Sequence, residues 1–256
     1  MMNIQNRKEV GDTNNKLNRA EKLIKKWFND TISRFETEIK SDRPVDHLCV
    51  TSLTVSVKYC EAIIILLSND CRMPAKALLR VLFELASKLA WCLRVPDEKM
   101  DVSDEIIGEK IRRWSKSTAT QKIKILKGFK ECIPDSEAGM VDSLLKRWEK
   151  LQESLDCKNM PNFVKMVKEL PSSWATELYT QCYLQFNDAV HLDVSSLGDR
   201  VVENGNKFSV GYDSKEDIKD LVQYCAVFEK MVFYLVRKHY EWDTVDMQDD
   251  FQCLSR

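Results

Sequence analysis

The chain has 256 residues, with 39 Lys and Arg against 40 Asp and Glu, so its formal net charge is -1. Hydrophobic residues make up 44% and charged residues 31%, the balance of a globular protein. Only 7 Gly and 6 Pro interrupt the chain, too few for a β-sandwich or barrel, which needs a turn about every 8–12 residues. The near-zero charge argues against a polybasic nucleic-acid binder.

The nine cysteines predict neither a zinc module nor a disulfide framework. They are odd in number and widely spaced, with no C-x-x-C pair and none at finger spacing from a histidine. The N-terminus lacks the apolar stretch of a signal peptide, and the longest purely apolar run, residues 62–67, is far shorter than the ~20 residues of a membrane span. We therefore expect a reduced, cytoplasmic protein with no membrane contact, no metal and no other cofactor.

The first part of the chain predicts three long helices. Apolar residues recur every three or four positions over residues 17–40, until Asp42-Arg43-Pro44 breaks the pattern. A second helix is predicted over residues 45–68, and a third runs from about Pro74 to Val95. Residues 1–15 are polar and are expected to form a flexible lead-in.

Four further helices are predicted in the middle of the chain, over residues 101–131, 136–157, 161–169 and 174–192. Ser and Thr residues near 115–120 could break the first of them. The second helix carries an apolar stripe that we expect to face inward, made of Met140, Leu144, Leu145, Trp148 and Leu151.

The last part of the chain predicts a β-hairpin and one more helix. Asn204-Gly205 between short β-branched runs indicates a hairpin near residues 200–211. Ser214 and Asp217 form a capping box before a helix with an apolar stripe, and residues 243–256 form an acidic, polar tail. The fold class is therefore all-α, a multi-helix bundle with one small β-hairpin in a single domain over residues 1–256.

A narrow polar stripe on the third helix is the first candidate site. Arg80 and Glu84 lie one turn apart in a strongly apolar sequence, and the stripe comprises Lys76, Arg80, Glu84, Ser87 and Lys88. Two interpretations stay open. Arg80 and Glu84 form either an ordinary exposed ion pair, worth about 0.3–0.5 kcal/mol, or a buried pair at the border of a site.

The late helix carries the second candidate site. Tyr183, Asn187 and His191 would share one helical face, and Asp188 lies three residues before His191. A carboxylate beside an imidazole fixes its tautomer and raises its pKa, which suits a general acid–base histidine. Alternatively, His191 has a structural role at the helix end, where a protonated imidazole interacts favourably with the helix dipole.

Charge is unevenly distributed along the chain. Residues 110–130 hold eight Lys or Arg and no acid, and residues 241–250 hold five acids and no base. The basic run could follow an RNA backbone, and Arg112, Arg113 and Lys116 are its candidate substrate-binding residues. Alternatively, the run is a solvated helix face whose charge the acidic tail balances. No phosphate loop, G-x-S-x-G or H-E-x-x-H motif occurs.

These features resemble a bacterial helical family of unknown function that is distantly similar to the HEPN (higher eukaryotes and prokaryotes nucleotide-binding) superfamily. The resemblance rests on the R-x-x-x-E helix with Arg80 and Glu84 and on the late Y…N-D-x-x-H motif. HEPN ribonucleases carry R-x4–6-H at a dimer interface and cleave RNA without metal. His191 matches that histidine and Asn187 the polar position, but the arginine position falls on Gln185 or Phe186.

The resemblance implies a metal-independent endoribonuclease or toxin of a bacterial stress or phage-defence system. His191 would act on the 2′-hydroxyl, oriented by Asp188, and Arg80, held by Glu84, would stabilise the phosphate. Tyr183 and Asn187 would position the substrate. The alternative is a non-catalytic helical module that binds a protein, nucleotide or nucleic acid. The partners implied are RNA, a protein such as an antitoxin, and a second copy in a homodimer.

Overall fold

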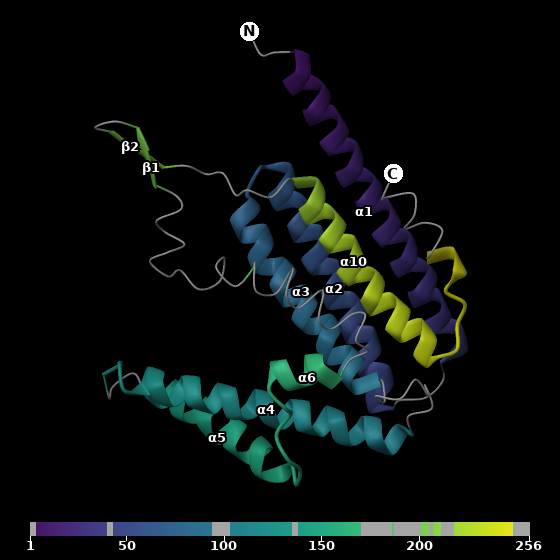
Figure 1. Cartoon of the computed structure of the whole chain (residues 1–256). Coiled ribbons are helices and arrows are strands. Elements are labelled where there is room, and N and C mark those ends of the chain that lie inside the picture. The colour runs from purple at the N-terminus through teal and green to yellow at the C-terminus, as the bar shows by residue number, and fades with distance from the viewer. Residues whose placement is uncertain are drawn as a thin grey trace.

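The computed structural model describes residues 4–39, 43–93, 103–134, 138–169, 186, 201–204, 207–210 and 218–247. The predicted all-α frame is confirmed (Figure 1). The helices are α1 (Ile4–Glu38), α2 (Pro44–Ser68), α3 (Arg72–Leu93), α4 (Asp104–Lys130), α5 (Ala138–Ser154), α6 (Phe163–Glu169) and α10 (Ile218–His239). Two short strands, β1 (Val201–Asn204) and β2 (Lys207–Val210), pair antiparallel with Val201 opposite Val210.

Helices α1, α2, α3 and α10 lie side by side and enclose the main core (Figure 1). Helix α10 packs against the other three, which explains why it is apolar on most of its circumference. Aromatic rings fill much of the space between the helices: Phe83 of α3 lies 5.2 Å from Phe228 of α10, and Trp27 of α1 lies 6.2 Å from Phe233. The predicted apolar stripe of α10 is buried at Leu221, Cys225, Phe228, Val232 and Leu235.

Helix α2 is the most apolar helix of the bundle. Among the described residues it alone is long and apolar enough to pass for a membrane span by length and composition. In the structure its neighbours are α1, α3 and α10, with α4 touching it as well. A helix enclosed on several sides by other helices needs little polar surface, so its packing accounts for its composition.

The start of α1 and the continuity of α4 differ from the sequence prediction. Helix α1 begins at Ile4, so residues expected to lead into the helix belong to it; residues 4–16 contain no proline and several good helix formers, so the helix can extend past its apolar part. Helix α4 is continuous through residues 115–120. The hydroxyls of Thr118 and Thr120 donate to the carbonyls of Trp114 and Lys116, four residues earlier, and so do not disrupt the helix.

The predicted inward stripe of α5 is wrong for three of its five residues. Met140 is 77% exposed, and Leu144 and Leu151 are also exposed, whereas Leu145 is buried and Trp148 half-buried. Helix α5 packs along α4, and no described helix covers its other side. A stripe on one helix therefore faces solvent here, because a two-helix hairpin can bury only a narrow part of each helix.

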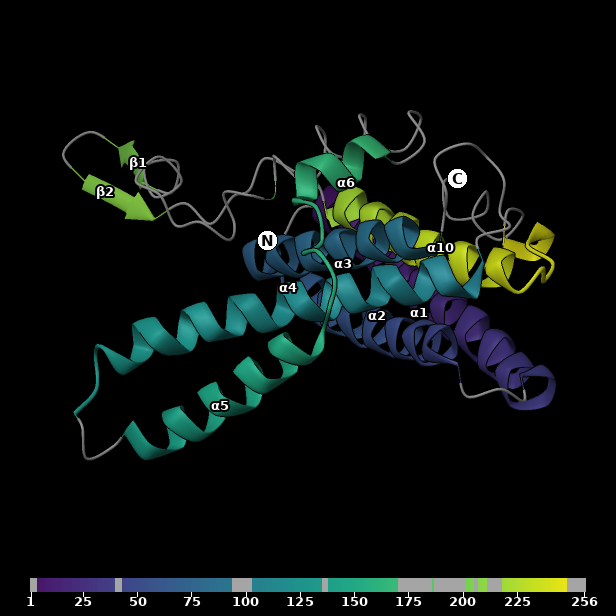
Figure 2. The ribbon, with the colours of Figure 1, turned by 90° about the horizontal axis from the view of Figure 1, so that it is seen from below.

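Figure 2 shows how α4 joins this hairpin to the bundle. The first half of α4 crosses α2 and α3, and its second half extends beyond them together with α5. Helix α6 returns the chain to the bundle, where Phe163 packs edge-on against Phe83 of α3, with 5.9 Å between the ring centroids. The hairpin has a small core of its own, made of Ile123, Val141 and Leu145.

Several predictions fall outside the described residues. They are the helix over 174–192, of which only Phe186 is described, the capping box of Ser214 and Asp217, and the end of the acidic tail beyond residue 247. The cysteines that the structure does describe are all free: Cys49, Cys60, Cys71, Cys92, Cys132, Cys157 and Cys225.

Candidate functional site

The Arg80–Glu84 pair exists on α3, and its environment lies between the two predicted extremes. Arg80 Nε lies 3.3 Å from Glu84 Oε1, and the two side chains are 12% and 27% exposed. Lys88, one turn further along the helix, places its Nζ 3.6 Å from the other oxygen of Glu84. Glu84 therefore pairs with a cation on each side, and its bond to Arg80 holds the guanidinium against the helix.

Two other residues of this polar stripe lie deeper than the ion pair. Lys76 and Ser87 are both buried, and the Ser87 hydroxyl has no hydrogen-bond partner among the described residues. At the far end, the Lys88 ammonium lies over the indole of Trp114 on α4, 5.9 Å from its centroid. The stripe therefore runs from inside the bundle to the junction of α3 and α4.

The predicted substrate-binding cations of α4 have different environments. Arg113 donates to the Asn159 carbonyl at 3.2 Å and lies over the Trp91 ring. Lys116 donates to the carbonyls of Leu155 and Cys157, at 2.9 and 2.7 Å. Both side chains therefore hold the segment after α5 against α4. Arg112 alone of the three is exposed.

Two cations near the end of the basic run form ion pairs with the neighbouring helix. Lys127 pairs with Glu149 at 3.0 Å and Lys130 with Asp142 at 2.6 Å, both acids being on α5. In the acidic tail, Asp246 pairs with Arg237 of α10. Within the described part of the chain, these two cations of the basic run therefore pair with α5 and not with the tail.

The late-helix candidates Tyr183, Asn187, Asp188 and His191 lie outside the described residues, so their roles stay predictions. Their neighbour Phe186 is helical and fully buried, and its ring lies 5.7 Å from that of Tyr224 on α10. Phe186 is one of the two positions at which the HEPN arginine would fall. A buried aromatic ring occupies that position, so any catalytic arginine must come from another element.

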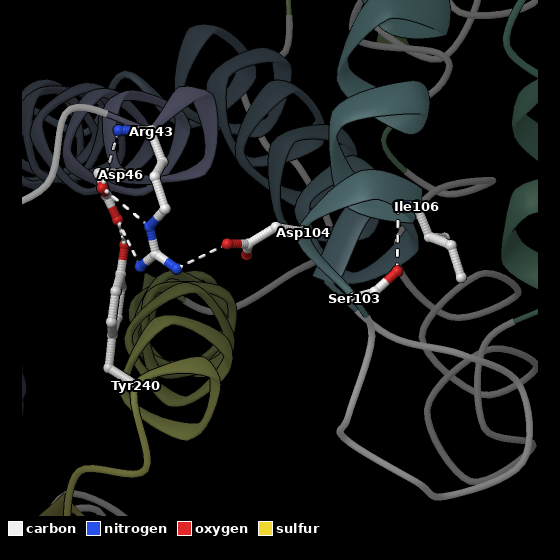
Figure 3. Close-up of polar contacts among 6 residues, drawn as sticks. All are labelled: Arg43, Asp46, Ser103, Asp104, Ile106 and Tyr240. Carbon is white, nitrogen blue, oxygen red and sulfur yellow. Dashed lines mark hydrogen bonds and ion pairs between the residues drawn. The ribbon is translucent and has the colours of Figure 1, made fainter.

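A polar cluster that the sequence analysis missed joins the ends of α2, α4 and α10 (Figure 3). The Arg43 guanidinium donates to Asp46 at 3.1 Å and to Asp104 of α4 at 2.9 Å. Arg43 N–H also donates to Asp46 Oδ2, as in a capping box. Asp46 further accepts a 2.6 Å hydrogen bond from the Tyr240 hydroxyl. This cluster fastens the start of α4 to the bundle.

Removing the Tyr240 hydroxyl tests the stabilising effect of this cluster. Burial, and then the neighbouring Cys49 and Asp46, raise the pKa of Tyr240, so the hydroxyl donates to Asp46 throughout the neutral range. Tyr240→Phe is expected to lower the free energy of unfolding by about 1.5–3 kcal/mol, the scale of a hydrogen bond to a charged group. Urea denaturation measures it, with Tyr59→Phe as the control. Equal stability of the two variants would contradict the assignment.

Glu229 is a second residue that the sequence analysis missed. It lies in the apolar stripe of α10, fully buried, and its carboxyl oxygens form hydrogen bonds with Ser56 Oγ at 2.9 Å and Cys60 Sγ at 3.3 Å, both on α2. Burial raises the pKa of this carboxyl to about 8, despite those two hydrogen bonds. An acid one turn after Cys225 in the predicted stripe was the signal that could have found it.

Arg237 is a third such residue, near the end of α10. Its side chain is 1% exposed, and its Nε donates to Thr31 Oγ1 of α1 at 3.0 Å. Its Nη1 donates to both carboxylate oxygens of Asp246, at 2.8 and 3.0 Å. The guanidinium thus anchors the segment after α10 to α1. The position of Arg237 in the last turn of a helix did not by itself predict this structural role.

None of these polar groups has the ligands of a metal centre, since no group of three His, Cys, Asp or Glu suited to a metal occurs within the described residues.

Comparison with known proteins gives a family match: residues 46–208 match a family described as a family of unknown function, DUF5677. No curated protein and no solved structure matches the chain.

Proposed function

Because the chain belongs to the family of unknown function DUF5677, whose description assigns no activity, we propose a function from its own residues. The protein is a metal-independent, HEPN-like endoribonuclease of a bacterial stress or phage-defence system, acting in the cytoplasm. The observation that supports this proposal is the Arg80 guanidinium, held by Glu84 within an otherwise apolar helix. A fixed guanidinium is suited to stabilising the charge that develops on a phosphate.

The proposed reaction uses the RNA 2′-hydroxyl as its nucleophile. His191, oriented by Asp188, takes the proton of the 2′-hydroxyl as the oxygen attacks the adjacent phosphorus. Arg80 stabilises the additional negative charge of the pentacoordinate phosphate, and Tyr183 and Asn187 position the nucleotide. The bond to the 5′-oxygen then breaks, this oxygen takes a proton from solvent water, and His191 returns the proton it accepted to the solvent. The products are a 2′,3′-cyclic phosphate and a 5′-hydroxyl end.

Cations beside Arg80 support binding of a polyanion at the same place. Lys88 shares Glu84 with Arg80 and lies against Trp114, so the stripe ends beside the basic helix α4. Of the three predicted binding cations on α4, Arg112 is the exposed one, and it is the one that we propose contacts RNA. Arg113 and Lys116 shape this surface by holding the segment after α5.

Arg80→Ala tests the proposal. Glu84 keeps Lys88 as a partner in this variant, so the fold is expected to survive, as circular dichroism would check. We expect RNA cleavage in EDTA to slow by about 10²-fold or more, the typical effect of losing one donor to a developing oxyanion. His191→Ala is expected to abolish it. The control is Arg72→Ala, which removes an arginine from the same helix.

Two results would contradict the enzyme proposal. One is the absence of metal-free cleavage by the wild-type protein, and the other is cleavage by Arg80→Ala and His191→Ala at the wild-type rate. Either result would favour the second candidate, a non-catalytic module that binds a protein partner. The exposed apolar residues of the α4–α5 hairpin favour that candidate, since large apolar side chains at one surface mark interaction sites.

A further inference from the structure

The hairpin of α4 and α5 carries a surface that RNA cleavage does not require. We call residues 118–130 and 138–154 the arm; it extends away from the bundle (Figure 2). Its own core consists of Ile123, Val141 and Leu145, with half-buried residues around them. Helices in water depend on packing for most of their stability. Within the described residues, the arm has only this small core and no third helix packed against it.

Five large apolar side chains are exposed on the arm. On α4, Ile125 and Phe129 are 64% and 54% exposed, and on α5, Met140 is 77% exposed. Leu144 and Leu151, also on α5, are each 38% exposed. Residues four or seven positions apart share a helical face, so each helix presents its exposed apolar residues along one line.

The two lines lie on the same side of the arm. Lys127 lies midway between Ile125 and Phe129 in sequence, and residues two apart point to different sides of a helix. Lys127 pairs with Glu149, which lies two residues before Leu151 and so points to a different side of α5. These ion-paired residues, with Lys130 and Asp142, occupy one side of the arm. The exposed apolar residues occupy the other side, which we call the apolar face.

The acids of the arm lie on only one of these two sides. All its acids lie on the ion-paired side, since Glu153 follows Glu149 by one turn and Asp142 pairs with Lys130. The apolar face is bordered by two exposed cations instead. Lys122 lies three residues before Ile125, and Arg147 lies three residues after Leu144.

We propose that the apolar face binds an acidic amphipathic helix of a partner protein. Two antiparallel helices with an open apolar side are completed by a third helix, which inserts its apolar side chains between them. Acids beside those side chains would meet Lys122 and Arg147, which gives the complex its charge complementarity. Met140 to Leu151 spans three turns of α5, so a partner helix of about 12–18 residues covers the face.

Two other occupants fit the charges less well. A second copy of the chain would bring the Lys122 and Arg147 of both copies to one interface, with the acids of both arms on the far sides. A membrane surface would accept the cations, but it has no side chains to insert between α4 and α5. The acidic helix alone meets both the shape and the charge of the face.

Designed peptides provide a probe for this proposal. Two labelled helical peptides of about 18 residues, long enough to span the face, carry the same leucine stripe, and their remaining positions are mostly Glu in one and mostly Lys in the other. Fluorescence anisotropy with the full-length protein is expected to show at least tenfold tighter binding of the acidic peptide at about 0.1 M salt, with the preference falling as salt rises.

Matched variants assign the binding to the apolar face. Phe129→Glu with Leu144→Glu is expected to weaken binding of the acidic peptide at least tenfold. Lys122→Glu with Arg147→Glu is expected to reverse the preference, so that the basic peptide binds more tightly. Lys146→Glu with Lys150→Glu makes the same charge change on exposed residues away from the face and is expected to keep the original preference. Circular dichroism checks the fold of each variant.

The remaining outcomes overturn the proposal. They are equal affinity for both peptides, no binding of either peptide, and a preference that Lys122→Glu with Arg147→Glu leaves unchanged. Light scattering that shows a dimer dissociated by Leu144→Glu, without peptide binding, would assign the face to a second copy. Cosedimentation with phosphatidylglycerol-containing vesicles, lost in the same variant, would assign it to a membrane. RNA cleavage is measured separately, so the two proposals can fail independently.

Discussion

Glu229→Gln is expected to abolish most of the fall in stability that the wild-type protein shows between about pH 5 and 8. Glu229 is fully buried between α2 and α10, and burial raises the pKa of its carboxyl from the ordinary 4.5 to about 8. Between these values the folded state holds a proton that the unfolded state has released. The free energy of unfolding therefore decreases as the pH rises through this range.

The size and direction of the effect follow from the pKa shift. The contribution of the neutral carboxyl is complete below pH 4.5 and is lost as the pH rises to about 8. The total change is on the order of 5 kcal/mol, at about 1.4 kcal/mol for each pKa unit. Glutamine does not titrate, so the variant is expected to match the wild type near pH 5 and to exceed its stability above pH 8.

The hydrogen bonds around Glu229 suit a neutral group. Ser56 Oγ has one hydrogen but lies 2.9 Å from both the Leu53 carbonyl and Glu229 Oε1. If Ser56 donates to Leu53, a protonated Glu229 can donate to Ser56 while accepting from the Cys60 thiol. A glutamine amide can make the same two bonds, which is why the variant should keep its packing.

Urea denaturation at several pH values measures this prediction. The pKa of Cys60 is raised well above 9, mainly by burial, so the thiol titrates outside the range of interest. Other groups contribute equally to both proteins, and the difference between the two stability curves isolates Glu229. Parallel curves for wild type and variant would show that the carboxyl is ionised in the folded protein, contrary to the prediction.

Asp246→Ala is expected to lower the free energy of unfolding by about 1–3 kcal/mol, the usual cost of leaving a buried hydrogen-bond donor without its partner, because Arg237 is buried although Asp246 itself is 41% exposed. Asp246 accepts two hydrogen bonds from Arg237 and is the carboxylate that pairs with it among the described residues. Arg237 is almost fully buried, and its Nη2 has no acceptor within the described part of the chain. Without Asp246, the charge would lie in the protein interior without compensation.

A double variant separates the cost of the unpaired charge from the loss of contacts. Arg237→Met with Asp246→Ala replaces the cation by an apolar chain and is expected to recover much of the lost stability. Glu36→Ala, which removes an exposed acid from α1, is the control and should change stability by less than about 0.5 kcal/mol. If the double variant is no more stable than Asp246→Ala, the unpaired charge is not the cause.

The bundle helices could be predicted because their sequence patterns are long and have clear ends. Helix α2 begins at Pro44 and ends at Ser68, as its apolar pattern and the Asn69-Asp70 pair indicate. The periodicity of α10 likewise identified its buried face. The local sequence pattern is therefore enough to predict these helices and their buried faces.

The environment of each stripe could not be predicted, because periodicity identifies a face but not what covers it. Met140 and Leu144 have the same spacing as core residues, and they are exposed only because no described helix packs beside α5. Similarly, the spacing of Arg80 and Glu84 predicted their ion pair but not its partial burial. Arg113 and Lys116 were predicted to bind RNA, because the sequence does not reveal that backbone carbonyls of the segment after α5 accept hydrogen bonds from them.

The position of α10 has a consequence for how the protein is made. It is the last long helix of the described chain, and it contacts α1, α2 and α3. Synthesis proceeds from the N-terminus, so α2 and α3 leave the ribosome well before the helix that covers them. Until His239 has emerged, their apolar sides must be shielded by chaperones or by transient collapse. Completion of the core therefore comes late in translation.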